Sequence, residues 1–208
     1  MRRSQGMVVL LVGPSCAGKS TLAAAIQAES DRPFLVQSLD GLFAATPDAY
    51  GGAGEHAGEG FRYDWLVPPG SHAPPVRRIA YGPVGRSLLE GFHRAVTAYA
   101  QAGVDVVVDD MLLDIEVLQD WAAALAGLDV LLVKVAARKA ELLHREAARV
   151  RRSTPGLVEG HLALHQGLVA DLAIDTTDAS PADCARKVLA AASTPGAGQA
   201  LAGYRRGY

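Results

Sequence analysis

The chain lacks the features that mark several large classes of protein. Its 208 residues include two cysteines, Cys16 and Cys184, whose positions match neither a metal site nor a disulfide framework. Its longest apolar runs have the length of a strand and fall well short of a membrane span. A net charge of −2 gives no sign of a surface for nucleic acid or for a membrane. These absences leave an ordinary globular protein, for which a reducing cytoplasm is the expected compartment.

The length and composition are those of one folded domain. Half of the residues are hydrophobic and a fifth are charged, which is enough apolar material to bury a core. The tail from 193 to 208 is rich in glycine and alanine and has no hydrophobic period, so we expect it to fray. We therefore place the domain at residues 1–192 and a flexible tail at 193–208.

The strongest chemical signal lies between residues 7 and 21. An apolar run at 7–12 is followed by GPSCAGKS at 13–20, which fits G-x-x-x-x-G-K-[ST] at every fixed position, and a helix is predicted over 21–28. Between a strand and a helix, such a loop points backbone N–H groups at phosphates. Lys19 would reach the β- and γ-phosphates, and the Ser20 hydroxyl would bind Mg²⁺. A glycine-rich turn without a ligand is the alternative. The predicted nucleotide-binding residues are Gly13, Pro14, Ser15, Cys16, Ala17, Gly18, Lys19, Ser20 and Thr21.

Short apolar segments alternate with helical patterns along the chain. An amphipathic helix is predicted over 84–102, and Ser180 followed by Pro181 begins another that runs to about Ala192. This alternation is typical of an α/β fold in which helices cover both faces of a parallel sheet. The five predicted strands are residues 7–12, 34–37, 104–108, 130–135 and 172–174.

The segment from 46 to 83 differs from the rest of the chain. It is rich in glycine and proline, has no helical period, and holds five of the twelve aromatic residues. A structureless connection of this length inside a compact domain is typical of a functional loop or lid. Residues 61–65, FRYDW, favour a short strand with one aromatic face. That face either contacts a substrate or forms a small satellite core that holds the loop down.

Acidic residues stand at the ends of two predicted strands. In an open α/β sheet the ligand crevice lies at the carboxyl ends of the strands, so these residues approach the phosphate loop. One of the pair Asp109 and Asp110, preferably Asp109, would hold Mg²⁺, and a solvated pair is the alternative. Asp40 could accept a proton from a substrate hydroxyl, or it could cap the turn that follows it.

Arginines gather on the segment after the fourth predicted strand. Arg145, Arg149 and Arg152 share one face of a helix, and Arg138 precedes them. One guanidinium group can donate two parallel hydrogen bonds to phosphate oxygens. A P-loop kinase carries lid arginines at this place in the chain. We place such a lid at residues 138–160. The alternative is a solvated helix on which the arginines pair with neighbouring glutamates.

Two of the six histidines, His161 and His165, are spaced to lie on one face of a helix. No acidic residue stands at ligand spacing beside them, so we expect no metal site there.

Several segments, taken in order, are more particular than the phosphate loop. They are GPSCAGKST, SLDGLFAATP, the YGP-x-x-R start of the long helix, AGVDVVVDDMLLD, LDVLLVKV, HREAARVRR and VADLAIDTT, and they extend from residue 7 to about residue 192. In these segments the chain resembles the chloramphenicol phosphotransferase-like family, within the shikimate- and adenylate-kinase-like P-loop group. The resemblance implies a three-layer fold in which a five-stranded parallel sheet has the order 2-3-1-4-5 and carries an arginine-bearing lid.

The resemblance also implies an activity. Enzymes of this kind move the γ-phosphoryl of ATP, with Mg²⁺, onto a hydroxyl of a small molecule, here an antibiotic such as chloramphenicol or a related natural product. Asp40 falls on the general base, Lys19 and Ser20 on the phosphate and Mg²⁺ positions, and Arg145 and Arg149 on the lid arginines. The adenine pocket would be bordered by Asp175, Thr176 and Thr177. The acceptor-binding candidates are Asp40, Phe43, Phe61, Tyr63, Trp65, Arg86 and Asp110.

The sequence leaves the acceptor open. Segment 46–83 looks longer, more aromatic and more basic than the same part of the chloramphenicol enzyme, so a sugar, a nucleoside or a nucleotide-sugar is an alternative acceptor. A nucleotide-dependent switch without an acceptor is a more distant alternative. A GTPase switch would show N-K-x-D after the fourth strand, where residues 134–138 read KVAAR.

Overall fold

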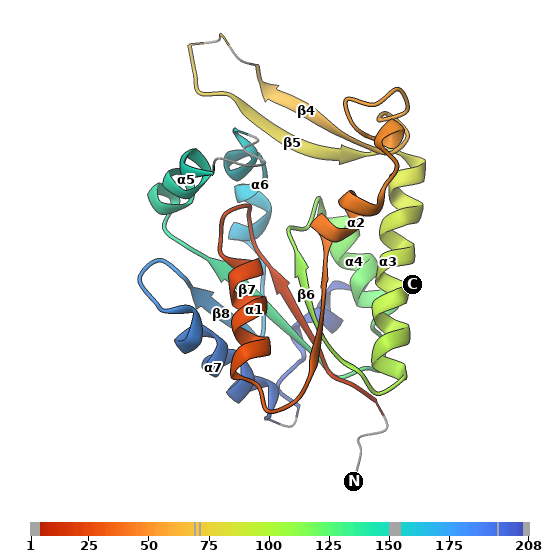
Figure 1. Ribbon diagram of the computed structural model, residues 1–208, viewed down its shortest axis with the longest axis vertical. Coiled ribbons are helices and arrows are strands. Elements are labelled where there is room, and N and C mark those ends of the chain that lie inside the picture. Colours follow the sequence, from red (N-terminus) through yellow and green to blue (C-terminus); the bar gives the residue numbers. More distant parts are fainter. Residues whose placement is uncertain (1–4, 69, 71, 150–154, 195, 206–208) are drawn as a thin grey trace.

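The computed structural model describes residues 5–68, 70, 72–149, 155–194 and 196–205 of the chain. A five-stranded sheet forms the body of the molecule, and a smaller three-stranded sheet stands beyond its carboxyl edge (Figure 1).

The central sheet has the predicted strand order. Its strands run β2-β6-β1-β7-β8 and every neighbouring pair is parallel, which is the order 2-3-1-4-5 of the predicted strands. Each residue of β1 is fully buried, because two strands flank it and helices cover both of its faces. The bounds are β1 Val8–Val12, β2 Phe34–Ser38, β6 Asp105–Asp110, β7 Val130–Ala136 and β8 Leu172–Asp175.

Helices pack on both faces of this sheet, as the sequence predicts (Figure 1). Val9 and Leu11 of β1 share a core with Ile26 of α1, whereas Leu10 points to the other face and shares a core with Trp121 of α4. Two helices therefore lie on each side of the sheet. The helices of the first face are α1 Lys19–Glu29 and α7 Pro181–Ala192, and those of the second are α3 Pro83–Gln101 and α4 Ile115–Ala124.

Three further helices surround the carboxyl edge of the sheet: α2 Leu39–Ala45, α5 Lys139–Ala148 and α6 Leu157–Gln166. The predicted helices at 84–102 and 181–192 are confirmed, and Ser180 caps α7 by accepting the N–H of Asp183 at 3.1 Å. Among the described residues, no helix is both long enough and apolar enough to span a membrane.

The described part of segment 46–83 forms regular secondary structure, so the prediction of a structureless loop is wrong there. It contains a 3₁₀ turn at Asp48–Tyr50 and a second sheet with the order β3-β4-β5. The predicted strand at 61–65 is confirmed as part of an antiparallel hairpin that projects from the body (Figure 1). The second strand of this hairpin escaped prediction because Arg77 and Arg78 interrupt the alternation of its apolar residues. The bounds are β3 Gly51–Gly52, β4 Phe61–Val67 and β5 Val76–Tyr81.

The prediction of a frayed tail is also wrong for the part that the structure describes. Residues 200–204 form a 3₁₀ turn (Ala200–Tyr204) in which Leu201 is buried against the core. The Asp171 carboxylate accepts the N–H groups of Gln199 and Ala200, each at 2.7 Å, and so fixes the start of this turn. A side chain before β8 thus supplies the anchor that the tail's own composition does not reveal.

Candidate functional site

The phosphate loop lies where predicted, between β1 and α1. Gly18, with a φ of +87°, ends the loop and caps α1. The Lys19 side chain is almost buried; its Nζ donates to the carbonyl of Pro14 at 3.0 Å and lies 3.8 Å from Oδ1 of Asp109. The loop residues that line the adjoining cleft are Ser15, Cys16, Gly18, Lys19, Ser20 and Thr21, while Gly13, Pro14 and Ala17 complete the turn behind them.

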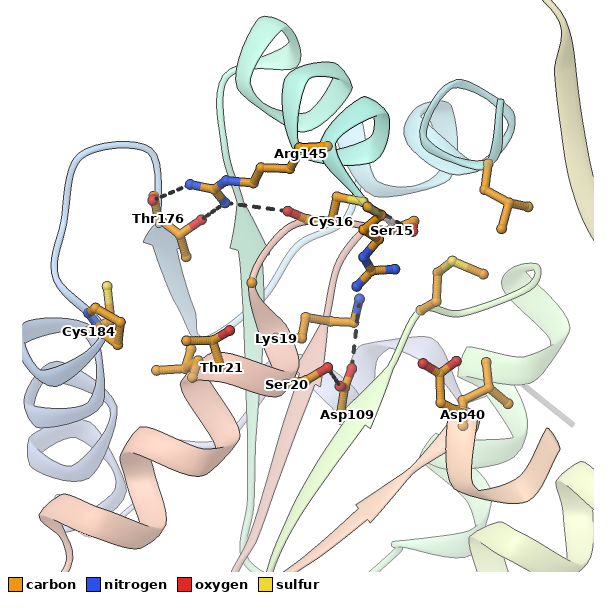
Figure 2. A pocket seen from close by; sticks show the side chains of 18 of the residues that line it. Ser15, Cys16, Lys19, Ser20, Thr21, Asp40, Asp109, Arg145, Thr176 and Cys184 are labelled. Atoms are coloured by element: carbon orange, nitrogen blue, oxygen red, sulfur yellow. Dashed lines mark hydrogen bonds and ion pairs between the residues drawn. The ribbon is translucent and has the colours of Figure 1, made fainter. Parts of the chain in front are cut away.

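Asp109 faces the phosphate loop from the neighbouring strand β6. It stands beside Leu11 of β1 in the parallel register, at the carboxyl edge of the sheet. The Ser20 hydroxyl donates to its Oδ2 at 2.5 Å, and Figure 2 shows Lys19, Ser20 and Asp109 together at the base of the cleft. Of the two predicted metal candidates on this strand, the structure therefore presents Asp109.

Asp110 points away from the cleft, so its predicted roles in metal and acceptor binding are wrong. Its side chain is fully buried and accepts the N–H of Leu112 and the indole N–H of Trp121, both at 2.7 Å. Successive side chains of a strand point to opposite faces of the sheet, so only one of the two aspartates can face the phosphate loop.

Arg145 of α5 lies over the phosphate loop and joins it to the loop after β8. Its guanidinium donates to the carbonyl of Cys16 at 3.4 Å and to the carbonyl of Thr176 at 2.9 Å (Figure 2). Its Nε also donates to Glu141 at 2.8 Å, so the pairing of an arginine with a neighbouring glutamate, which is the alternative that the sequence offers, is present at this residue. Glu141 holds the guanidinium in one orientation, in which Nη1 and Nη2 donate to the phosphate loop and to Thr176.

The other arginines of this segment are placed differently. Arg149 lines the cleft at the end of α5, and no described residue forms a side-chain hydrogen bond or an ion pair with it. Arg138 precedes α5, pairs with Asp178 at 3.0 Å and does not line the cleft. Arg152 lies outside the described residues.

The residues predicted to border the adenine lie on the loop that follows β8. Thr176 and Thr177 line the cleft, and the Thr176 hydroxyl donates to the carbonyl of Ala17 at 2.8 Å. Asp175 does not line the cleft. Hydrogen bonds from Thr177 lower the pKa of the Asp175 carboxyl group. The Asp175 carboxylate therefore stabilises the conformation of this loop.

Asp40 lies across the cleft from Arg145 and Thr176 (Figure 2). It lies in the first turn of α2, where Ser38 is the residue that caps the helix by accepting the N–H of Gly41 at 3.0 Å. Asp40 is therefore not the cap; its side chain is exposed and points into the cleft (Figure 2). Within the described part of the chain, no side chain pairs with it, which leaves both oxygens free to accept a proton.

The cleft has a volume of about 1080 Å³ and continues from the phosphate loop to the hairpin. Phe43 of α2, Tyr63 of β4 and Ile79 of β5 form its far wall. The same three residues also line a side pocket of about 210 Å³, together with Phe61. Phe61 is buried and meets Phe43 edge to face at 4.7 Å, so the aromatic residues form both a satellite core and a cleft wall.

Besides Asp110, two predicted acceptor residues do not line the cleft or its side pocket. Trp65 lies farther out on the hairpin, where the guanidinium of Arg77 stacks 3.8 Å from its ring centre. Arg86 begins α3 and pairs with Glu116 at 2.6 Å on the exposed surface. Both predictions are wrong, because Trp65 lies beyond the cleft along β4, on the same side of the strand as Tyr63, and Arg86 belongs to α3 rather than to the hairpin.

His161 and His165 are buried on α6 directly behind the acceptor wall. His161 accepts the backbone N–H of Ile79 at 3.0 Å through Nε2. Burial lowers the pKa of His161 to about 4 and that of His165 to about 3, so both rings are neutral near pH 7. The sequence analysis assigns no role to either histidine. It also misses Ile79, because Ile79 reaches the cleft through strand β5, which was not predicted.

The fold and the site define a P-loop kinase, with a phosphate loop, a strand-end aspartate and an arginine helix around one cleft. The chain belongs to the chloramphenicol phosphotransferase-like family, whose model matches residues 6–193. A relative from Mycobacterium tuberculosis (strain ATCC 25618 / H37Rv), Rv2636, is named as a candidate O-phosphotransferase and is 28% identical over 185 residues, which cover 88% of this chain and 81% of that protein. The chain is thus an ATP-dependent small-molecule phosphotransferase.

Solved structures with low sequence identity share the fold. A sugar kinase from Janibacter sp. HTCC2649 has a TM-score of 0.60 and 17% identity and covers 89% of this chain and 93% of its own. The tunicamycin resistance protein of Deinococcus radiodurans has a TM-score of 0.60 and 15% identity, with coverages of 91% and 96%. The APS kinase CysC of Mycobacterium tuberculosis has a TM-score of 0.57 and 18% identity, with coverages of 89% and 96%.

Proposed function

We propose that the enzyme transfers the γ-phosphoryl of ATP to a hydroxyl of an antibiotic such as chloramphenicol or a related natural product. The observation that carries the proposal is the position of Asp40. Its free carboxylate lies in the same cleft as Lys19 and the Ser20–Asp109 pair, on the side where Phe43, Tyr63 and Ile79 offer an apolar wall. A phosphate donor and a hydroxyl acceptor can therefore meet in one cleft.

The nucleotide end of the cleft suits ATP. Backbone N–H groups of the loop and the N-terminus of α1 favour bound phosphates, and Lys19 adds a buried positive charge. The APS kinase structure that shares this fold contains AMPPNP and APS. The adenine would lie against Thr176 and Thr177, beyond the phosphates.

The residues at the base of the cleft fit Mg²⁺. Mg²⁺ prefers oxygen ligands, and the Ser20 hydroxyl and the Asp109 carboxylate provide them side by side. Ser20 would bind the ion directly and Asp109 would hold it through water, and the bound ion would neutralise charge on the β- and γ-phosphates.

Asp40 would act as the general base. As the acceptor oxygen bonds to phosphorus, its proton passes to the Asp40 carboxylate, and the bond between the γ-phosphorus and the β–γ bridging oxygen breaks to release ADP. Arg145 and Arg149 would stabilise the negative charge on the migrating group, since both are directed at the cleft from α5. A cytoplasmic location, where ATP is available, completes the proposal.

A panel of acceptors tests the proposal. ADP release with Mg²⁺ and ATP would be measured alone and with chloramphenicol, tunicamycin, gluconate, a nucleoside and a nucleotide-sugar. We expect an antibiotic to raise ADP formation well above the hydrolysis background and to gain one phosphate by mass spectrometry. If ADP formation rises only with the sugar or the nucleoside compounds, the acceptor is another metabolite and not an antibiotic. Turnover that ignores every acceptor would favour a nucleotide-dependent switch.

A further inference from the structure

Helix α6 lies between helix α5 and the hairpin strand β5 (Figure 1). One of its neighbours is α5, which carries Arg145 to the phosphate loop, and the other is β5, which carries Ile79 to the acceptor wall. A side chain of α5 contacts the start of α6, whereas β5 contacts α6 through its backbone. Each contact fixes the position of α6 relative to the neighbouring element.

Glu146 ties α5 to α6. Its carboxylate accepts the N–H of Gly156 at 3.1 Å and the N–H of Val158 at 2.8 Å, two groups at the start of α6 that no helical carbonyl can satisfy. The negative charge also matches the positive end of the α6 dipole. Glu146 follows Arg145 directly, so the residue that holds α6 is next to the residue that reaches the phosphate loop.

Backbone packing ties α6 to β5. The N–H of Arg77 donates to the carbonyl of Gly156 at 3.1 Å. A Cβ atom on Gly160 would lie 1.9 Å from the carbonyl oxygen of Arg77, so only glycine permits this approach. The helix and the strand are therefore in direct backbone contact, without intervening side chains that could give way.

His161 adds a third contact at the acceptor wall itself. Its Nε2 accepts the N–H of Ile79, and its second hydrogen-bond partner is the backbone of Leu112. Leu112 follows Asp109 and Asp110 on the segment after β6, and its own N–H is held by Asp110. One neutral imidazole thus joins the acceptor wall to the segment that presents Asp109.

We propose that α6 couples occupancy of the nucleotide site to the position of the acceptor wall, with Glu146 and His161 as positioning residues. The inference rests on the proposed function, because it assigns the nucleotide to Arg145 and the acceptor to the hairpin. Nucleotide that engages Arg145 fixes α5, Glu146 then fixes α6, and His161 and the Arg77 contact fix β5. Coupling between two binding sites is reciprocal, so an acceptor held against the hairpin would in turn steady the arginine over the phosphates.

Hydrogen exchange with Mg²⁺ and AMP-PNP tests the coupling without a known acceptor. The amide of Ile79 is itself the donor to His161, so exchange in peptides covering 76–81 reports on this contact directly. In the wild-type enzyme we expect AMP-PNP to slow exchange in α5 and, about fivefold or more, in 76–81.

Two variants interrupt the link on either side of α6. In Glu146→Gln the amide can accept only one of the two N–H groups and carries no charge; in His161→Asn the acceptor for Ile79 is lost. Both should bind AMP-PNP and keep the protection of α5, but lose most of the added protection of 76–81. His161→Gln, whose carbonyl can reach the Nε2 position, should restore it. Glu90→Gln on α3, where Glu90 pairs with Arg94 at 3.6 Å, is the matched control and should behave as wild type.

The outcomes separate the coupling from a purely structural role. Loss of the AMP-PNP effect at 76–81 in both variants, with folded protein by circular dichroism, supports the proposal. An unchanged effect in Glu146→Gln and His161→Asn, or no effect on 76–81 in the wild type despite binding, overturns it and leaves the proposed function intact. Failure of AMP-PNP to bind the wild-type enzyme would instead overturn the proposed function and this inference together.

Discussion

Asp109 and Asp110 are adjacent on β6 and point to opposite sides of the sheet. Asp109 accepts the Ser20 hydroxyl beside the phosphate loop, whereas Asp110 accepts the indole N–H of Trp121 in the core. The same substitution at the two positions should therefore affect different properties of the enzyme.

Asp109→Asn should weaken the use of Mg²⁺. The amide keeps the shape of the side chain but loses the charge that would hold the ion through water. We expect the Mg²⁺ concentration for half-maximal activity to rise by about tenfold or more, with little change in the free energy of unfolding. The measurement is ADP formation as a function of Mg²⁺ concentration at saturating ATP. An unchanged Mg²⁺ dependence would remove Asp109 from the metal site.

Asp110→Asn should act on stability instead. Both carboxylate oxygens accept N–H groups in the core, and an asparagine must turn its NH₂ toward one of those donors. We expect a loss of about 1–3 kcal/mol in the free energy of unfolding, measured by urea denaturation, while the Mg²⁺ dependence stays that of the wild type. A loss of Mg²⁺ dependence in this variant alone would reverse the assignment.

These two residues also show how far the sequence carries the prediction. The loop at 13–20 and the strand ends are local patterns, so the nucleotide end of the site and the five strands could be predicted from them. The order of the strands comes instead from the resemblance to a known family. The choice between Asp109 and Asp110 depends on which face of β6 meets Trp121, a contact eleven residues away in the chain. The acceptor wall depends on the pairing of Tyr63 with Ile79, which a pattern broken by two arginines does not reveal.

Asp40→Asn should slow phosphoryl transfer and spare nucleotide binding. Asparagine cannot take the proton of the acceptor hydroxyl, and position 40 lies on α2, outside the phosphate loop. We expect kcat to fall by about 10²–10⁴-fold with ATP affinity nearly unchanged, measured by steady-state kinetics and by titration with AMP-PNP. Asp31→Asn, at an exposed turn, is the control. If turnover stays within about tenfold of wild type, Asp40 is not the base.

Arg145→Lys should lower turnover although the charge is kept. A lysine offers a single ammonium group and cannot span the carbonyls of Cys16 and Thr176 while also pairing with Glu141. We expect kcat to fall by about a hundredfold in the presence of acceptor. Arg94→Lys on α3 tests the same exchange at an exposed pair and should leave kcat unchanged. A kcat equal to wild type in Arg145→Lys would show that position 145 needs charge alone.

The buried histidines make stability depend on pH. His161 and His165 have pKa values of about 4 and 3 in the folded protein, below the ordinary 6.5. Between these values, the two histidines bind protons in the unfolded chain and not in the folded protein. Stability is then fully present above pH 6.5 and is lost as the pH falls toward 4. Each histidine should contribute a loss of about 2 kcal/mol between roughly pH 7 and pH 5, measured by urea denaturation. His161→Gln should remove about half of the total loss that the two histidines cause. A variant that loses as much stability as the wild type between these pH values would contradict the assignment.

The side pocket allows a test of the acceptor's size. The pocket of about 210 Å³ exceeds the cavity of about 150 Å³ that holds benzene in an engineered protein, so an apolar ring fits against Phe43 and Phe61. Gly51 lines this pocket with a φ of −121°, which any residue can adopt, and a Cβ there meets no atom within 4 Å. Gly51→Leu should therefore fill part of the pocket without disturbing the fold.

For an acceptor that carries a ring, we expect Gly51→Leu to raise KM by about tenfold or more, because the apolar burial of the ring is lost. The KM for ATP should not change. Gly58→Leu is a matched control: its Cβ also meets no atom within 4 Å, but Gly58 does not line the pocket. Both variants would be compared by the initial rate of ADP release against acceptor concentration. Equal KM values in Gly51→Leu and Gly58→Leu would place the ring elsewhere, in the main cleft between Asp40 and Tyr63.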